Sequence, residues 1–445
     1  MLRSRRAAWG VALGFALVAV AAPRGAVAQE TASDTLLTVQ HYLDYETVSN
    51  PQISPNGSQI IYTRRWVDKL NDRFETALWV MGADGSRNRF LVKGGGAIWS
   101  PDGTRIAYLA EAQEPKGTQI FVRFMDSEGA STQITRLTES PSDIRWSPDG
   151  KHIGFTSFVS RPAQWKIDMP SSPEGAKWTK APRLVERLHY RQDRRGYTEP
   201  GYTHLFIVPA DGGTPRQITS GDWSVGFRFD GMAGNVGWTW SPDGKTIVVE
   251  GLEEADADLR YRDANLYAID VAAGARRKLT ATEGTWTSPE ISPDGRRVAF
   301  TGYPKTRQTY RTSDLYVMNI DGSGVRKLSG DLDRDPQELR WAHDGSGVYF
   351  TANDRGSNNI LFAAVGGGVR PVTTGVQMLS LGSIARNGVA VGVRSSFHTP
   401  PDLVRLDLRR PQQVTQLTSV NDDLLGAGSA GRRIRLGEVE EVWYT

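Results

Sequence analysis

The chain has 445 residues, of which 39% are hydrophobic and none is cysteine. Its 53 basic and 50 acidic residues leave a formal charge of +3, a balance that does not predict binding to nucleic acid or to an anionic membrane surface. Without cysteine there is no disulfide framework, lipidated cysteine or thiolate metal site, so a hydrophobic core must supply the stability.

The first residues have the pattern of a secretory signal peptide. Three arginines among the first six residues precede an uncharged apolar run over residues 7–22, and small residues lead up to Ala28. The run is shorter than the ~20 residues of a membrane-spanning helix. We therefore expect cleavage of residues 1–28 after Ala28, export to the periplasm or the medium, and no membrane contact after cleavage.

Residues 29–50 form a lead-in segment before the first repeat. The sequence between Thr38 and Thr47 is compatible with a short helix.

One stretch, Trp146-Ser147-Pro148-Asp149-Gly150, recurs along the chain. Its serine position returns seven times, whole or eroded, at residues 54, 100, 147, 241, 292, 342 and 385, with alanine at the last two. Proline fixes φ at the second turn position, aspartate tolerates the third, and glycine takes the left-handed conformation that closes a hairpin. We expect the serine to accept a hydrogen bond from a turn N–H and the tryptophan to fill the seam between stacked sheets.

Most of these serine positions lie 43 to 51 residues apart, which is close to the period of a propeller blade. Each unit reads as four alternating strands and ends on a Leu-Thr-like pair. There are seven such pairs, at residues 91–92, 137–138, 218–219, 279–280, 328–329, 372–373 and 417–418. The sequence therefore predicts an all-β fold, a seven-bladed β-propeller of four-stranded antiparallel blades over residues 51–418. Because each unit holds its own four strands, we expect the ring to close without borrowing a strand from the other end.

The interval of 94 residues between the third and fourth motifs is twice the usual length. Residues 159–203 within it contain five prolines, many charges and little strand alternation. We interpret this segment as a long insertion in blade 3, because only one closing pair lies in the interval; the alternative is an eighth blade.

No catalytic constellation is found in the sequence. The Gly-x-Ser-x-Gly elbow, the phosphate-binding loop and the His-Glu-x-x-His motif are all absent, and the 6 histidines have no ligand spacing. We expect no catalytic residue, metal site or cofactor in this chain.

The insertion does carry candidate substrate-binding residues. Tyr190, Arg191, Arg194, Tyr197 and Glu199 lie close together in the sequence. Arginine forks bind carboxylates or carbonyls, and a glutamate can meet a peptide amine. The segment is therefore either a lid or specificity loop for peptides, or a solvated charged hairpin.

Three stretches together resemble one family. They are residues 48–57, residues 173–179 continuing through 201–213, and residues 417–424 continuing through 436–445. These stretches resemble the propeller of exported serine peptidases of the prolyl oligopeptidase family, on the acylaminoacyl-peptidase and dipeptidyl-peptidase side. In that family the propeller caps a C-terminal α/β-hydrolase domain with a Ser, Asp, His triad, restricts access to small peptides, and helps to hold the substrate N-terminus.

The resemblance implies small peptide substrates and the protein's own hydrolase domain as partners. Residues 419–445 would begin the connection to that domain, and no triad residue can be carried over because the chain stops at Thr445. On this interpretation the chain is a fragment or a truncated product, and it is inactive alone. The alternative is a non-enzymatic periplasmic propeller of the Tol type that binds proteins.

Overall fold

The structure is a computed structural model that describes residues 36–126, 128–161, 170–179, 182–193, 196–226, 237–260, 262–308, 310–425, 434 and 436–444. The predicted signal peptide lies outside these residues. No helix in the described ranges is long and apolar enough to span a membrane.

The lead-in segment contains the short helix α1 (Val39–Asp44). The backbone N–H of Thr38 donates to His41 Nδ1 at 2.9 Å, which satisfies one donor at the start of the helix. The helix ends before β1 begins at Thr47, so it is shorter than the segment over which the sequence permits it.

The described strands pair mainly with their neighbours in the chain, in antiparallel sheets. Sheet 1 holds β1 (Thr47–Ile53), β2 (Gln59–Asp68), β3 (Arg73–Gly82) and β4 (Arg89–Lys93). Sheet 2 holds β5 (Gly95–Trp99), β6 (Arg105–Gln113), β7 (Lys116–Phe124) and β8 (Ser131–Gln133). Sheet 3 holds β9 (Ser142–Trp146), β10 (His152–Ser160), β13 (Gly201–Pro209) and β14 (Arg216–Gln217). Sheet 4 holds β15 (Trp238–Trp240), β16 (Thr246–Gly251), β17 (Asn265–Asp270) and β18 (Arg276–Lys278). Sheet 5 holds β19 (Gly284–Ile291), β20 (Arg297–Pro304), β21 (Asp314–Asn319) and β22 (Arg326–Lys327).

The last sheet has nine strands. They are β23 (Gln337–Trp341), β24 (Gly347–Asp354), β25 (Ser357–Ala364), β26 (Val369–Pro371), β27 (Met378–Leu379), β28 (Ser383–Ile384), β29 (Val389–Ser396), β30 (Thr399–Asp407) and β31 (Val414–Gln416). The two-residue strand β27 pairs with both β25 and β29, and so it joins two groups of four strands that each repeat the order of the other sheets.

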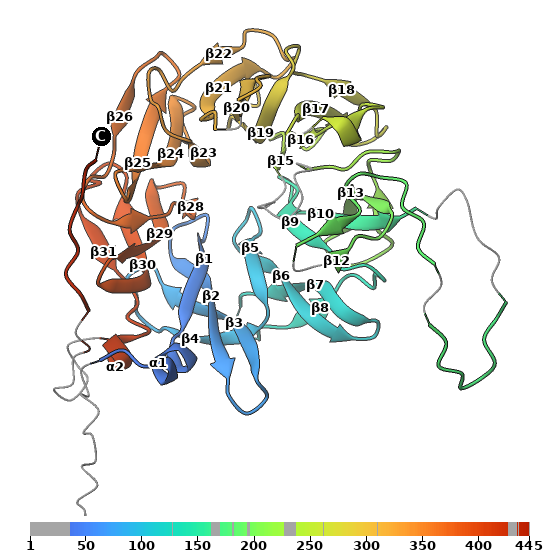
Figure 1. Ribbon diagram of the computed structural model, residues 1–445. Helices are drawn as coiled ribbons and strands as arrows, with labels where there is room; N and C mark the ends of the chain where they lie inside the picture. Colours follow the sequence, from blue (N-terminus) through green and yellow to red (C-terminus); the bar gives the residue numbers. More distant parts are fainter. Residues whose placement is uncertain are drawn as a thin grey trace, which may run out of the picture.

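The sheets follow one another around a ring, and the first lies next to the last (Figure 1). Val48 and Ile53 of β1 belong to one buried cluster with Val391 and Leu403 of the last sheet. Among the described residues β1 pairs only with β2. Apolar packing therefore joins the first and last sheets, and within the described residues no strand is exchanged between them.

The recurring motif forms the turn between the first and second strands of each repeat. In sheet 3, Gly150 has φ +68° and its N–H donates to Ser147 O at 2.9 Å. The Ser147 hydroxyl accepts from His152 N at 2.9 Å, as predicted, and donates to Asp149 Oδ1 at 2.5 Å. This hydroxyl lowers the pKa of the Asp149 carboxyl, while partial burial acts in the opposite direction.

The motif tryptophans join neighbouring sheets. The indole N–H donates to a carbonyl in the first strand of the preceding sheet, at 3.0 Å for Trp99 to Gln52 and 3.2 Å for Trp146 to Ile98. Trp146 is 7% exposed and packs in a cluster with residues of both sheets. The predicted seam-filling role is confirmed for Trp146, and the indoles of Trp99, Trp146 and Trp341 also hydrogen-bond to a neighbouring sheet, whereas Trp240 Nε1 has no hydrogen-bond partner among the described residues.

The closing pairs have an equally regular function. In the last sheet the Thr418 hydroxyl accepts from Leu403 N at 2.9 Å and donates to Asp402 Oδ1 at 2.7 Å. The same polar position near the start of the third strand is filled, from sheet 2 onward, by Gln119, His204, Asn265, Asp314, Asn359 and Asp402, each hydrogen-bonded to a Thr or Ser hydroxyl. In sheet 2 this hydroxyl is that of Thr135, so the predicted closing pair at residues 137–138 is wrong and Ile134-Thr135 takes its place. The repeat thus ends on Thr because its hydroxyl ties the fourth strand to the third.

One of these polar residues makes stability depend on pH. His204 is buried, and burial lowers its pKa below the ordinary value of about 6.5. Below that pH the unfolded chain binds a proton that the folded chain does not, so stability is lost as the pH falls toward the lowered folded pKa. We expect the free energy of unfolding, measured by chemical denaturation, to fall between pH 7 and pH 5. In His204→Asn, which copies the residue of sheet 4, this loss should be smaller; an unchanged loss would contradict the assignment.

Candidate functional site

The antiparallel strand order gives the ring two distinct rims. The motif turns form one, which we call the motif rim. The other, the terminal rim, is formed by the described residues of the segments between the second and third strands of the repeats, 69–72, 114–115, 161, 170–179, 182–193, 196–200, 252–260, 262–264, 305–308, 310–313, 355–356 and 397–398. Both ends of the described chain lie on the terminal rim. The Asn421 side chain exchanges hydrogen bonds of 2.8 and 2.9 Å with the backbone of Glu46, and α1 and α2 (Asp422–Leu425) lie side by side (Figure 1).

The C-terminal segment extends along this rim. His398 Nε2 lies 2.8 Å from Gly437 O, and the Arg355 guanidinium lies over the Trp443 ring at 5.4 Å. Any domain connected through residues 436–444 would therefore start on the terminal rim.

A central cavity of about 550 Å³ is lined by first strands of sheets 1, 3 and 5 and of the last sheet. Three charged residues meet in it. Glu290 Oε1 lies 3.9 Å from Arg145 Nη1 and 3.8 Å from Arg340 Nη1, so one carboxylate lies between two guanidinium groups. Burial in the cavity lowers the pKa of Arg145, and Arg340 adds to this effect whereas Glu290 opposes it.

The repeat explains how these three charges come together. Each of the three lies two residues before a motif serine position, at 147, 292 and 342. Because the repeats share one register, this position faces the ring centre in each repeat, and three charged side chains are directed into one space. The spacing was visible in the sequence, but only the arrangement of the sheets shows which face of the strand points inward.

A second regular feature shapes the cavity wall. Asn50, Asp143, Ser288 and Glu338, each four residues before a motif serine position, have left-handed backbone with φ of 49°, 49°, 55° and 52°. The register with the neighbouring strand shifts at these positions, which marks a β-bulge.

Two carboxylates bind amides beside these bulges across the seams. Glu250 is 4% exposed; its Oε2 accepts from Ser288 N of the next sheet at 2.7 Å and its Oε1 accepts from Gly237 N at 3.0 Å. Glu338 Oε2 accepts from Leu381 N at 2.6 Å in the same way. The buried Glu250 and the exposed Glu338 thus both hold inner strands in place around the cavity.

The structure brings together only part of the substrate-binding set predicted in the insertion. Tyr190 and Tyr197 stack with ring centroids 6.0 Å apart and remain exposed, on either side of the hairpin β11 (Arg191–Gln192) and β12 (Gly196–Tyr197). Glu199 pairs with Arg183 at 3.5 Å, and the Arg183 guanidinium lies over the Tyr197 ring at 4.9 Å. Arg191 is exposed in β11, and Arg194 lies outside the described residues. Arg183 could not be predicted from the sequence, because no pattern in an irregular segment shows which arginine a glutamate meets.

The insertion is anchored on the terminal rim by Asp258. This carboxylate accepts from Leu188 N at 3.3 Å and lies 3.8 Å from His189 Nδ1. At the base of the insertion, the Arg187 guanidinium lies over the Tyr202 ring at 4.3 Å and donates to its hydroxyl. The predicted site residues that the structure describes, Tyr190, Arg191, Tyr197 and Glu199, therefore belong to the terminal rim and not to the central cavity.

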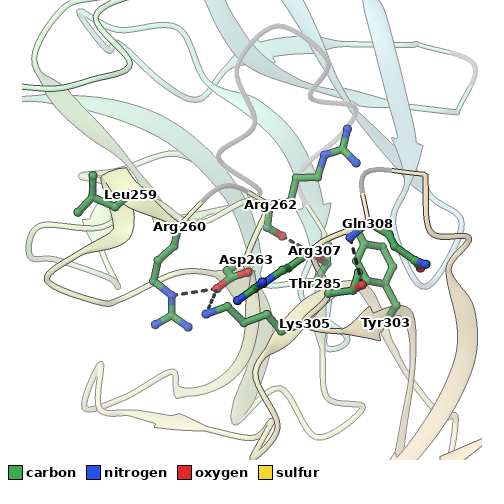
Figure 2. A pocket seen from close by; sticks show the side chains of 10 residues that line it. Leu259, Arg260, Arg262, Asp263, Thr285, Tyr303, Lys305, Arg307 and Gln308 are labelled. Atoms are coloured by element: carbon green, nitrogen blue, oxygen red, sulfur yellow. Dashed lines mark hydrogen bonds and ion pairs between the residues drawn. The ribbon is translucent and has the colours of Figure 1, made fainter.

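A second cavity of about 280 Å³ opens on the terminal rim between sheets 4 and 5 (Figure 2). It lies beside the 3-10 helix η1 (Ala257–Leu259), which contains the anchoring Asp258. Within the described ranges no group of three or more His, Cys, Asp or Glu side chains has an arrangement that could hold a metal ion.

Comparison with known proteins places this architecture in a class. The family described as TolB beta propeller domain (PD40) matches residues 236–424. The acylaminoacyl peptidase of Pyrococcus horikoshii has a TM-score of 0.65 at 18% identity, covering 85% of this chain and 53% of that chain. The propeller domain of the Trilobed protease from Pyrococcus furiosus has a TM-score of 0.60 at 18% identity, covering 86% of this chain and 98% of that chain. The chain has an all-β fold of the β-propeller class.

Curated relatives narrow the class. Dipeptidyl-peptidase 5 of Porphyromonas endodontalis is 24% identical over 428 residues, covering 93% of this chain and 60% of that protein. The uncharacterized peptidase YuxL of Bacillus subtilis is 25% identical over 443 residues, covering 92% of this chain and 61% of that protein. The chain is therefore similar to the propeller part of proteins named as peptidases, which supports the predicted resemblance to the prolyl oligopeptidase family. It spans between 54% and 61% of the length of these curated relatives.

Proposed function

We propose that the chain is the substrate-gating and substrate-binding propeller of an exported serine peptidase that acts on small peptides. The observation that carries this proposal is the central cavity, in which the Arg145–Glu290–Arg340 group lies across the ring centre. A cavity of about 550 Å³ has the size of a small-ligand site and admits a short extended chain, whereas a folded protein is far too large. The peptidase names of the relatives support peptides as the ligands.

We propose that the propeller has seven blades. The nine-stranded sheet is taken as two blades bridged by β27, and residues 161–200 as an insertion between the second and third strands of blade 3. The continuous pairing of β10 with β13, from His152 with Pro209 to Ser160 with Gly201, supports this interpretation over an eighth blade.

An α/β-hydrolase domain is the proposed partner, and the terminal rim is its proposed docking face. The tips of the terminal-rim segments carry the exposed apolar side chains Leu70, Leu259, Tyr310 and Phe397, at 92%, 74%, 80% and 54% exposure. Apolar side chains that gather on one face indicate a contact surface. The C-terminal segment leaves the propeller on the same face, so a following domain would meet it directly.

The proposed gating function is tested by removing the two arginine side chains from the central cavity. In the protein that includes the catalytic domain, replacing Arg145 and Arg340 with alanine removes both guanidiniums from the cavity. We expect kcat/KM for peptides of about ten residues to rise several-fold relative to dipeptides, because a wider passage admits longer chains. The double variant Arg65→Ala, Arg89→Ala removes the same charge from two exposed positions and serves as the control. Equal effects on short and long peptides would contradict a filter in the cavity.

The insertion is tested through Glu199. Replacing Glu199 with glutamine in the same protein should raise KM about tenfold for peptides with a free N-terminus, because the carboxylate that would pair with the amine is lost. N-acetylated peptides should show no change. Glu174→Gln, another exposed position of the insertion, is the matched control. If Glu199→Gln and the wild type had equal KM values for peptides with a free N-terminus, the insertion would be a structural hairpin and not a substrate-binding loop.

A second candidate is a non-enzymatic propeller of the Tol type that binds proteins. The match of residues 236–424 to the family described as TolB beta propeller domain favours this second candidate. A protein-binding propeller requires no catalytic domain. It predicts no serine-hydrolase activity in any form of the protein.

A further inference from the structure

The cavity on the terminal rim between sheets 4 and 5 carries a strong excess of positive charge. Four of its lining side chains are basic, Arg260, Arg262, Lys305 and Arg307, and only Asp263 is acidic. A concave site with this balance attracts anions, because its walls reduce the water that screens the charges.

The basic residues do not all have the same function. Arg260 Nε donates to Asp263 Oδ2 at 2.9 Å and its Nη2 donates to Glu283 Oε1 at 2.8 Å. Arg260 Nη1 also lies 3.9 Å from Glu254 Oε1 and 3.8 Å from Asp256 Oδ1, so Arg260 is occupied by four carboxylates, of which Asp263 is 9% exposed. Figure 2 shows Arg260 and Lys305 both directed at Asp263.

Lys305 and Arg307 are the donors that remain near the opening. Lys305 Nζ lies 3.0 Å from Glu283 and 3.6 Å from Asp263, and Glu283 raises the pKa of the ammonium, so it stays charged. Both residues are exposed, and Arg307 makes no ion pair with any residue that the structure describes. An ammonium and a guanidinium two residues apart present several N–H donors to one small anion.

The backbone next to the cavity is also unusual. Arg262 has φ +67°, in the left-handed region that a long side chain rarely adopts, and its carbonyl accepts from the Thr285 hydroxyl at 2.6 Å. Strained residues of this kind cluster at ligand sites. The strain supports a site that is built and held, in agreement with the ion pairs of Arg260.

We propose that this pocket binds the carboxylate of a peptide, with Arg307 and Lys305 as its donors. The inference rests on the proposed peptide ligand and adds an anchoring point for it. Asp263 and Glu283 lie in or beside the wall, so a monoanion suits the site better than a doubly charged group. The exposed Leu259 offers an apolar contact to the residue that carries the carboxylate. At about 280 Å³ the pocket takes one terminal residue or one acidic side chain.

The test is a calorimetric titration of the chain itself with three probes. Gly-Leu has a free terminal carboxylate, Gly-Leu-amide has none, and N-acetyl-glutamic acid α-amide has only a side-chain carboxylate. We expect Gly-Leu to bind, the amide to bind at least about tenfold more weakly, and added salt to weaken the stronger binding. Stronger binding of the glutamic acid probe than of Gly-Leu would also support the carboxylate site and would identify an acidic side chain as its source.

Arg307→Gln should weaken the carboxylate probe at least about tenfold, while Arg311→Gln, an exposed arginine outside the pocket, should change binding less than about twofold. Circular dichroism verifies that both variants are folded. Binding of Gly-Leu-amide as strong as that of the stronger carboxylate probe, no binding of either carboxylate probe, or equal effects of the two substitutions would overturn the proposal. Binding to the isolated chain requires no catalysis, so a negative result in this titration does not contradict the gating proposal. A failure of the peptidase proposal likewise does not contradict the carboxylate site.

Discussion

Replacing Trp146 with alanine should lower the free energy of unfolding by about 3–5 kcal/mol, the range observed when a large buried aromatic side chain is removed. The side chain is 7% exposed, fills the seam between sheets 2 and 3, and donates its indole N–H to Ile98 O. The substitution leaves a cavity at the seam and removes the donor of that carbonyl. Denaturant unfolding followed by circular dichroism measures the change.

Trp443→Ala is the matched control. Trp443 is 70% exposed on the C-terminal segment, so its loss should change the unfolding free energy by less than about 0.5 kcal/mol. A comparable loss in both variants would show that Trp146 does not hold the sheets together.

The second large effect is expected at Glu250. Replacing Glu250 with alanine should cost about 3–5 kcal/mol, because it removes two hydrogen bonds to a buried charged group and leaves the amides of Gly237 and Ser288 without their acceptor. One of these bonds crosses from sheet 4 to sheet 5, so the loss also loosens the cavity wall. The unfolding midpoint in urea measures it.

Two variants separate the causes. Glu250→Gln retains one acceptor oxygen and should lose about half as much, since a neutral amide accepts more weakly than a carboxylate. Glu139→Ala removes an exposed carboxylate and should be nearly neutral. If Glu250→Ala were as stable as wild type, the carboxylate would not hold the inner strands.

Much of the scaffold could be predicted because its rules are local. The turn at Ser147, Asp149 and Gly150 depends on residues within one hairpin, and Trp146 points to the opposite face from its neighbour by strand alternation alone. The closing pairs were found as a pattern, but their purpose, a hydroxyl bridge to the polar start of the third strand, becomes clear only when Thr418 and Asp402 are seen together.

The cavity could not be predicted, because its residues come from distant repeats. Arg145, Glu290 and Arg340 look like ordinary surface charges when each strand is read alone. The bulge residues Asn50 and Glu338 share a backbone conformation but no side-chain type, so composition carries no signal for them. Long-range geometry of this kind depends on how the sheets pack, which no local pattern encodes.

The insertion shows the same limit within one segment. The sequence placed two tyrosines, two arginines and a glutamate together, and the structure does stack Tyr190 on Tyr197. It pairs Glu199 with Arg183, which lies outside the predicted group. Without regular strands, sequence distance does not determine which charged side chains meet.

The most direct test of the peptidase proposal uses the coding sequence that follows Thr445. The protein expressed with that sequence is treated with a fluorophosphonate probe and assayed with short peptides, beside the 445-residue chain. We predict that the longer protein is labelled on serine and hydrolyses the peptides, and that the 445-residue chain does neither. A stop codon directly after Thr445, or a longer product with no reactive serine and no peptidase activity, would contradict the peptidase proposal and favour the protein-binding propeller.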